Sequence, residues 1–286
     1  MLTLSNASLH VSLLDPASPT DRQRVGARYC WGGYIWQVED APGGPLLTGP
    51  EWPEPAPDPY NGQGLPESFR SHAFGTKEPL HTENGIGFIL GVGDVVETRA
   101  GVLEVTEPCT WEISHRADEV TFVTEQSGNG YACRLTRRVA LDGRQLVSAS
   151  RVENLGERAL PLHWFAHPFF ALTDGQITCA LPSSWWMDAN EGFTLDGTSR
   201  LSLKRRFRDT RDGHFELLHV GDESLQAVLS HPTLSEVTLA TDFVPDLCPV
   251  WGNSATWSIE PYLITELAPG ETHAWRLTYR FGLVSG

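Results

Sequence analysis

Glycine and proline interrupt this chain so often that long helices have little room to form. The 286 residues include 27 glycines and 20 prolines. Glycine weakens a helix through its backbone freedom, and proline breaks one because it has no amide hydrogen to donate. The short segments between these breaks are therefore expected to form strands.

Six of the segments alternate apolar and polar residues with a period of two and are rich in β-branched or aromatic side chains, which is typical of strands. They cover residues 102–114, 119–126, 144–154, 224–231, 236–243 and 274–283. Turn sequences such as Asp-Gly and Pro-Gly-Glu separate them. The pattern predicts an all-β fold, a large antiparallel β-sandwich.

One domain over residues 1–286 is the simplest organisation of such a chain. The only candidate linker is the proline-rich stretch GPEWPEPAPDPYNGQG at 49–64. A boundary there would leave an N-terminal piece without a core of its own. We interpret 49–64 as a long loop that crosses the sandwich and covers a site.

Charge and cysteine content limit the partners and the compartment. A formal net charge of −15 disfavours nucleic acid and anionic membrane surfaces as partners. The basic run KRRFR at 204–208 is interpreted as solvated surface rather than as a phosphate site. Five cysteines without a CxxC spacing indicate buried thiols in a reducing compartment. Since the sequence shows neither a signal peptide nor a membrane-spanning segment, we expect a cytoplasmic protein.

The stretch HWFAHPFF at 163–170 places two histidines four positions apart. Pro168 disfavours a helix here, and in a strand the two imidazoles would lie roughly 13 Å apart, too far to share one metal ion. The histidines are then either packed in the core or used for acid–base chemistry. The loop motifs of nucleotide-binding proteins and the signatures of common hydrolases do not occur in the sequence.

The surroundings of this stretch resemble the galactose mutarotase-like (aldose 1-epimerase) superfamily. Asn154, Gly156 and Pro161, followed by His-Pro-Phe-Phe at 167–170, are similar to the family's Asn-x-Gly turn and to its strand ending in His-Pro-Tyr-Phe. The resemblance implies the family's β-sandwich and makes His167 a candidate catalytic residue.

A C-terminal segment carries the second part of the resemblance. Ser-Ile-Glu at 258–260 is similar to the family's strand end that holds the catalytic carboxylate, and Leu-Ala-Pro-Gly-Glu at 267–271 to the turn before its last strand. The resemblance assigns Glu260 to that carboxylate. His81, Arg28 and Arg70 are further candidates for contacting the hydroxyls or phosphate of a sugar.

The reaction implied by the family is the interconversion of sugar anomers through an open-chain aldehyde. A base must take the proton of the C1 hydroxyl while an acid protonates the ring oxygen. A glutamate with a pKa of about 4.3 is ionised near neutrality, and a nearby negative charge can hold an imidazole of pKa about 6.5 in its protonated form. We therefore expect Glu260 to be the base and His167 the acid, with no metal or organic cofactor.

The expected partner is a small-molecule sugar or sugar phosphate, which requires apolar faces as well as polar groups. Among the ten tryptophans, Trp186 and Trp251 are predicted to offer stacking faces. Trp186 belongs to the pair Trp185–Trp186, whose side chains should point in opposite directions on an extended segment. The sequence predicts no oligomeric state.

Two alternatives remain open at this point. The family scaffold could serve as a catalytically silent carbohydrate-binding or regulatory domain, because a fold by itself does not define a function. Phe169 stands where the family has tyrosine, and LHTENG replaces the family's Leu-His-Gly-Gly. A cupin-like metalloenzyme is the other alternative, although the sequence has no close His-x-His pair.

Overall fold

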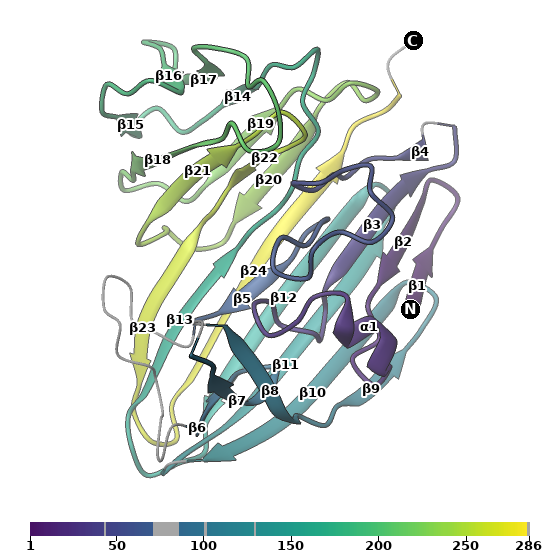
Figure 1. Cartoon of the computed structure of the whole chain (residues 1–286), viewed down its shortest axis with the longest axis vertical. Helices are drawn as coiled ribbons and strands as arrows, with labels where there is room; N and C mark the ends of the chain where they lie inside the picture. Colours follow the sequence, from purple (N-terminus) through teal and green to yellow (C-terminus); the bar gives the residue numbers. More distant parts are fainter. Residues whose placement is uncertain (43, 71–85, 100–101, 129, 285–286) are drawn as a thin grey trace.

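The computed structural model describes residues 1–284 except 43, 71–85, 100–101 and 129 (Figure 1). The described residues form strands almost throughout, with a single short α-helix, α1 (Pro19–Gln23). In this part of the chain no helix is long and apolar enough to span a membrane. The predicted all-β fold is confirmed.

A ten-stranded antiparallel sheet forms the largest layer. Its strands, in spatial order, are β16 (Phe193–Leu195), β17 (Arg200–Leu203), β14 (Thr178–Ala180), β19 (Gln226–Leu229), β20 (Val237–Thr241), β24 (Thr272–Phe281), β12 (Gln145–Asn154), β11 (Tyr131–Asp142), β10 (Glu119–Gly128) and β9 (Glu112–His115). Along β11 and β12 buried residues alternate with more exposed ones, so one face of the sheet packs against the core.

Smaller antiparallel sheets complete the fold (Figure 1). One contains β1 (Leu2–Ser5), β2 (Leu9–Leu13), β3 (Ile35–Asp40) and β4 (Gly44–Pro45), and another contains β6 (Ile86–Ile89), β7 (Gly93–Glu97) and β8 (Leu103–Pro108). Two more sheets hold residues of the site. The first has three strands, β23 (Tyr262–Leu267), β13 (Leu160–Ala166) and β5 (Glu67–Phe69). The second has four strands, β15 (Trp186–Met187), β18 (His214–His219), β21 (Cys248–Gly252) and β22 (Trp257–Ile259).

The predicted strands at 119–126, 144–154, 224–231, 236–243 and 274–283 correspond to β10, β12, β19, β20 and β24. The stretch 102–114 differs from its prediction, because it forms two strands, β8 and β9, in different sheets. The alternating pattern continues across the break, so it did not reveal that the chain changes sheet.

The strand predicted at 163–170 ends earlier than its sequence pattern suggests. β13 stops at Ala166, one residue before His167. Proline has no amide hydrogen, so Pro168 cannot continue the ladder of hydrogen bonds. The chain resumes pairing at Phe170, which forms an isolated bridge with Trp257.

A buried ion pair joins β5 to the large sheet. Glu67 on β5 accepts hydrogen bonds from the guanidinium of Arg137 on β11, from Ser148 on β12 and from the indole of Trp164 on β13. The side chains of Arg137 and Glu67 are only 1% and 3% exposed. The contacts therefore fix β5 through the core.

We expect removal of one partner of this pair to be costly. Arg137→Met should lower the free energy of unfolding by about 3 to 5 kcal/mol, because Glu67 would be left buried without its counter-ion. Urea denaturation gives the measurement. Arg134→Met, on the same strand but in exposed ion pairs with Glu125 and Glu153, is the matched control and should change stability little. Equal losses in both variants would contradict the importance of the buried pair.

Candidate active site

Backbone pairing brings two distant segments of the chain together at the candidate site. Phe170 and Trp257 exchange amide–carbonyl hydrogen bonds of 2.9 and 3.1 Å, and the amide of Ala166 donates to the carbonyl of Pro261 at 3.3 Å. Both sets of bonds belong to one antiparallel pairing of the two segments. His167 and Glu260 lie between them and face each other.

The two side chains form a buried pair. The Nε2 atom of His167 lies 3.3 Å from Oε1 of Glu260. The residues are 6% and 5% exposed, respectively. The hydroxyl of Ser258, which is fully buried on β22, lies 3.0 Å from the other ring nitrogen of His167, Nδ1. The structure thus brings together the two residues that the sequence selected.

Aromatic rings surround the imidazole of His167. The centroid of its ring lies 4.5 Å from that of Phe169, and the rings of Phe165, Tyr29 and Trp251 lie 6.2 to 6.3 Å away. These rings bury most of the imidazole, and burial disfavours its charged form.

The surroundings reverse the charge state expected from the sequence. Burial lowers the pKa of His167 well below its ordinary value, and the cation of Arg28 lowers it further. Burial raises the pKa of Glu260 to about 8, although Arg28 and Arg70 oppose the rise. Near neutral pH the site therefore favours a neutral imidazole and a carboxylic acid. The predicted imidazolium and carboxylate contain the same number of protons, but the charged arrangement is disfavoured by burial.

The pair opens onto a cleft of about 1120 Å³. Its lining includes five residues of the predicted site: Arg28, Arg70, His167, Trp251 and Glu260. This volume exceeds the ~300 to 1,000 Å³ typical of small-molecule sites, so a sugar ring can be accommodated.

The proline-rich loop at 49–64 forms part of the wall of this cleft. Pro50, Glu51 and the stretch 58–61 line it. Within the same region the guanidinium of Arg28 donates to the carbonyl of Tyr60 at 2.7 Å. The loop therefore contributes to the lining of the cleft.

Of the other two predicted binding residues, His81 lies outside the described residues. Trp186, which is 53% exposed on the edge strand β15, stacks on His219 with a centroid distance of 3.5 Å and does not line the cleft. Its neighbour Trp185 is buried, so the two rings do point in opposite directions, but the outward direction at Trp186 leads to solvent.

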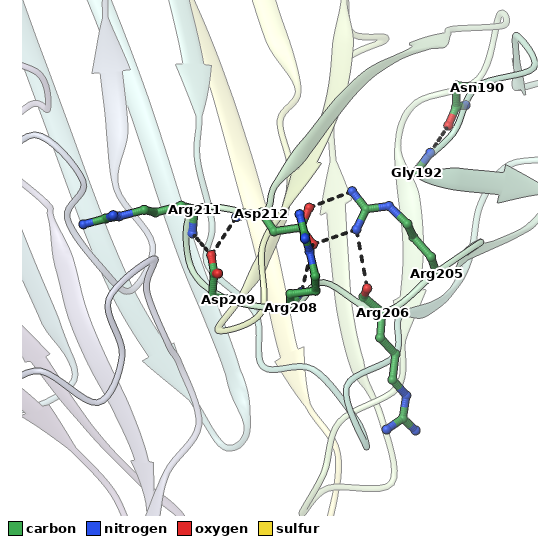
Figure 2. Close-up of polar contacts among 8 residues, drawn as sticks. All are labelled: Asn190, Gly192, Arg205, Arg206, Arg208, Asp209, Arg211 and Asp212. Carbon is green, nitrogen blue, oxygen red and sulfur yellow. Dashed lines mark hydrogen bonds and ion pairs between the residues drawn. The ribbon is translucent and has the colours of Figure 1, made fainter.

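Arg211 lines the cleft and was missed by the sequence analysis. It follows the basic run 204–208. Asp212 binds this run, because it accepts two hydrogen bonds from the Arg205 side chain (2.8 and 2.7 Å) and two from Arg208, through its backbone amide (2.9 Å) and its side chain (3.2 Å). Figure 2 shows the Arg211 side chain extending away from this cluster, while Asp209 binds its backbone amide. The basic run was interpreted as solvated surface, and only the turn geometry decides which arginine lines the cleft.

Tyr262 is a second residue that the sequence analysis missed. It lines the cleft and stacks on Phe165 with a centroid distance of 4.6 Å and an interplanar angle of 6°. Burial, together with the charge of Glu260, raises the pKa of its hydroxyl to about 12. Its position two residues after Glu260, in the sequence Glu-Pro-Tyr, was the available signal.

Metal coordination has no obvious place in the described part of the chain, where no group of three or more His, Cys, Asp or Glu residues could hold an ion. All five cysteines are free, and four of them are buried.

No family model and no curated protein sequence matches this chain. Solved structures match it over nearly its full length. A galactose mutarotase related enzyme from Lactobacillus acidophilus has a TM-score of 0.62 and 14% identity, with 99% of this chain and 98% of that one covered. A galactose mutarotase-like protein from Lactobacillus casei has a TM-score of 0.61 and 15% identity, with coverage of 98% and 99%.

A third match is an aldose epimerase homologue from C. elegans, with a TM-score of 0.50, 11% identity and 99% coverage of both chains. At these identities the likeness concerns the fold. The chain has the galactose mutarotase-like fold, as the sequence resemblance predicted.

The shifted pKa of Glu260 predicts a loss of stability in mildly alkaline solution. The folded state holds a proton on this carboxyl up to about pH 8, whereas the unfolded chain releases it near pH 4.3. Below pH 6.5 the unfolded chain binds a compensating proton on His167. Stability is therefore expected to fall by ~2 kcal/mol between pH 6.5 and 8, and to change little through this pair between about pH 4.3 and 6.5, where the two effects cancel.

Urea denaturation at pH 6.5 and pH 8.5 measures this effect. Glu260→Gln has no carboxyl to titrate, so its stability should vary less over this interval than that of the wild type. The same pH dependence in both proteins would show that Glu260 does not retain its proton on folding.

Proposed function

We propose that this protein is an aldose 1-epimerase, which interconverts sugar anomers by acid–base opening of the ring. The observation that carries the proposal is the buried pair of His167 and Glu260, 3.3 Å apart on the wall of a cleft that admits a sugar. The C1 hydroxyl and the ring oxygen are bonded to the same carbon. An acid and a base that act on both must therefore lie close together.

The charge state of the pair sets the direction of the first proton transfers. The carboxylic acid of Glu260 protonates the ring oxygen while Nε2 of His167 takes the proton of the C1 hydroxyl. The bond between C1 and the ring oxygen breaks, and C1 becomes an aldehyde. The pair is left as a carboxylate and an imidazolium.

The second half of the reaction restores the pair. After rotation about the bond between C1 and C2, the ring hydroxyl attacks the other face of the aldehyde. Glu260 takes back its proton from this hydroxyl, and His167 returns its proton to the new C1 hydroxyl. The roles of acid and base are thus reversed relative to the sequence-based assignment, because the starting pair is neutral.

Arg28 and Arg70 support this cycle. Both cations lower the pKa of Glu260 and so favour the carboxylate that forms when the ring opens. Burial acts in the opposite direction, and the balance leaves the pKa at about 8. A catalytic pKa close to the working pH allows one group to donate and to accept protons efficiently.

Substitution of either member of the pair should suppress mutarotation. We expect Glu260→Gln and His167→Asn to lower kcat by about 10² to 10⁴, the usual contribution of positioned proton transfer. Polarimetry and NMR of freshly dissolved α-glucose and α-galactose measure the rate.

A second His–Glu pair provides the matched control. His214 and Glu216 lie 3.5 Å apart on β18, and neither lines the cleft. Glu216→Gln should leave the rate unchanged. If the wild-type protein binds sugars but accelerates none of them, the site belongs to a carbohydrate-binding domain and the proposed activity is wrong.

The cleft also favours an aldose that carries a negative group. Arg28, Arg70 and Arg211 line it in a protein whose net charge is −15. Guanidinium groups bind phosphate oxygens with good geometry, and their field attracts anions into the cleft. We therefore include aldose phosphates among the proposed substrates.

Arg211→Gln tests this extension. It should raise KM for glucose 6-phosphate about tenfold or more, which corresponds to the loss of one charge-assisted contact. KM for glucose should not change. Arg208→Gln is the control, since the Arg208 side chain is 85% exposed and faces Asp212. If both sugars respond equally to Arg211→Gln, this arginine does not distinguish the phosphate.

A further inference from the structure

Ser258 contacts His167 and lies two residues before Glu260. Its hydroxyl lies 3.0 Å from Nδ1 of His167, and its side chain is among the groups that lower the pKa of Glu260 and so favour the carboxylate. Ser258 is fully buried and lies directly opposite Trp251, a residue that lines the cleft, in the pairing of β22 with β21. It therefore has no competing contact with bulk water.

The strand geometry explains why Ser258 lies near both His167 and Glu260. Side chains two residues apart on an extended chain point to the same side, so Ser258 and Glu260 face the same way. Trp257 pairs with Phe170 through the backbone, which brings the segment of His167 alongside. One hydroxyl thus lies between the imidazole and the carboxyl.

A hydroxyl has a single proton to donate, and this limits what Ser258 can do. If it donates to Glu260, its oxygen must accept the proton on Nδ1 of His167. This pattern suits the neutral pair as well as the charged pair, because Nδ1 carries a proton in both. The mobile proton then moves only among Nε2, Glu260 and the substrate.

We infer that Ser258 is a positioning residue that keeps the proton of His167 on Nδ1 and thereby reserves Nε2 for proton exchange. The inference rests on the proposed epimerase function for its effect on rate. The placement of the proton is a property of the protein alone. Other titratable groups near the pair are Arg28, Arg70, Tyr29, Tyr262 and Cys248.

The ¹⁵N chemical shifts of the His167 ring test the placement directly, without substrate. In the wild-type protein at neutral pH we expect the tautomer with the proton on Nδ1. In Ser258→Ala we expect a substantial population of the tautomer with the proton on Nε2, because Nδ1 has lost its acceptor. An unchanged tautomer in Ser258→Ala would overturn the inference.

The pH dependence of kcat gives a second readout. Loss of the hydrogen bond to Glu260 removes a group that favours the carboxylate, so the upper pKa of the profile should rise in Ser258→Ala. We expect kcat to fall about tenfold with little change in KM. Ser258→Cys keeps a weak donor of similar size and should recover part of the rate. A uniform loss of rate without a shift in the profile would indicate a structural role only.

Ser150→Ala is the matched control. Ser150 on β12 is also buried, and its hydroxyl has no hydrogen-bond partner within the described residues. This variant should keep the wild-type tautomer, rate and pH profile. If the wild-type protein proves inactive while the tautomer still changes in Ser258→Ala, the proposed function fails and the role of Ser258 stands. If the wild-type protein is active and Ser258→Ala matches it in every respect, the role of Ser258 fails alone.

Discussion

The candidate site depends on one backbone pairing. The segment that follows β13 pairs with β22 and Pro261 through hydrogen bonds at Ala166 and Phe170. Those bonds set the register in which His167 faces Glu260. A slip of one residue would turn one of the two side chains to the opposite face of its strand. The reactive geometry is therefore a consequence of main-chain hydrogen bonding between segments that are far apart in the sequence.

β5, which also lies beside His167, is fixed by a buried ion pair rather than by backbone hydrogen bonds alone. β5 contributes Ser68 and Phe69 to the cleft and accepts the amide of His167 at Pro66, just before the strand begins. Glu67 ties this strand through the core to Arg137 on the large sheet. A buried ion pair adds little net stability, but it tolerates only one arrangement of its partners. In this fold the arrangement aligns one wall of the cleft with His167 and Glu260.

Burial and charge act against each other at the site. The aromatic surroundings of His167 favour neutral forms of the pair, whereas Arg28 and Arg70 favour the carboxylate of Glu260. In the proposed reaction, ring opening converts the neutral pair into the charged pair, so a balance between these two influences would keep the barrier to proton transfer low. Ser258, whose hydroxyl lies 3.0 Å from Nδ1, adds the proposed constraint on the imidazole. In the proposed cycle, His167 and Glu260 exchange protons with the sugar, while Ser258 holds the imidazole in place.

The sequence by itself determined the strand-rich fold and the choice of His167 and Glu260. The alternation of apolar and polar residues and the turn sequences are local features of the chain. The motifs around His167 and Glu260 are likewise short stretches of sequence. Only the tertiary structure decided the ionisation of the pair, the break between β8 and β9, the place of Arg211 in the cleft lining and the outward direction of Trp186. Each of these depends on which groups from distant segments surround a side chain. Desolvation and side-chain direction arise from packing, which no short stretch of sequence contains.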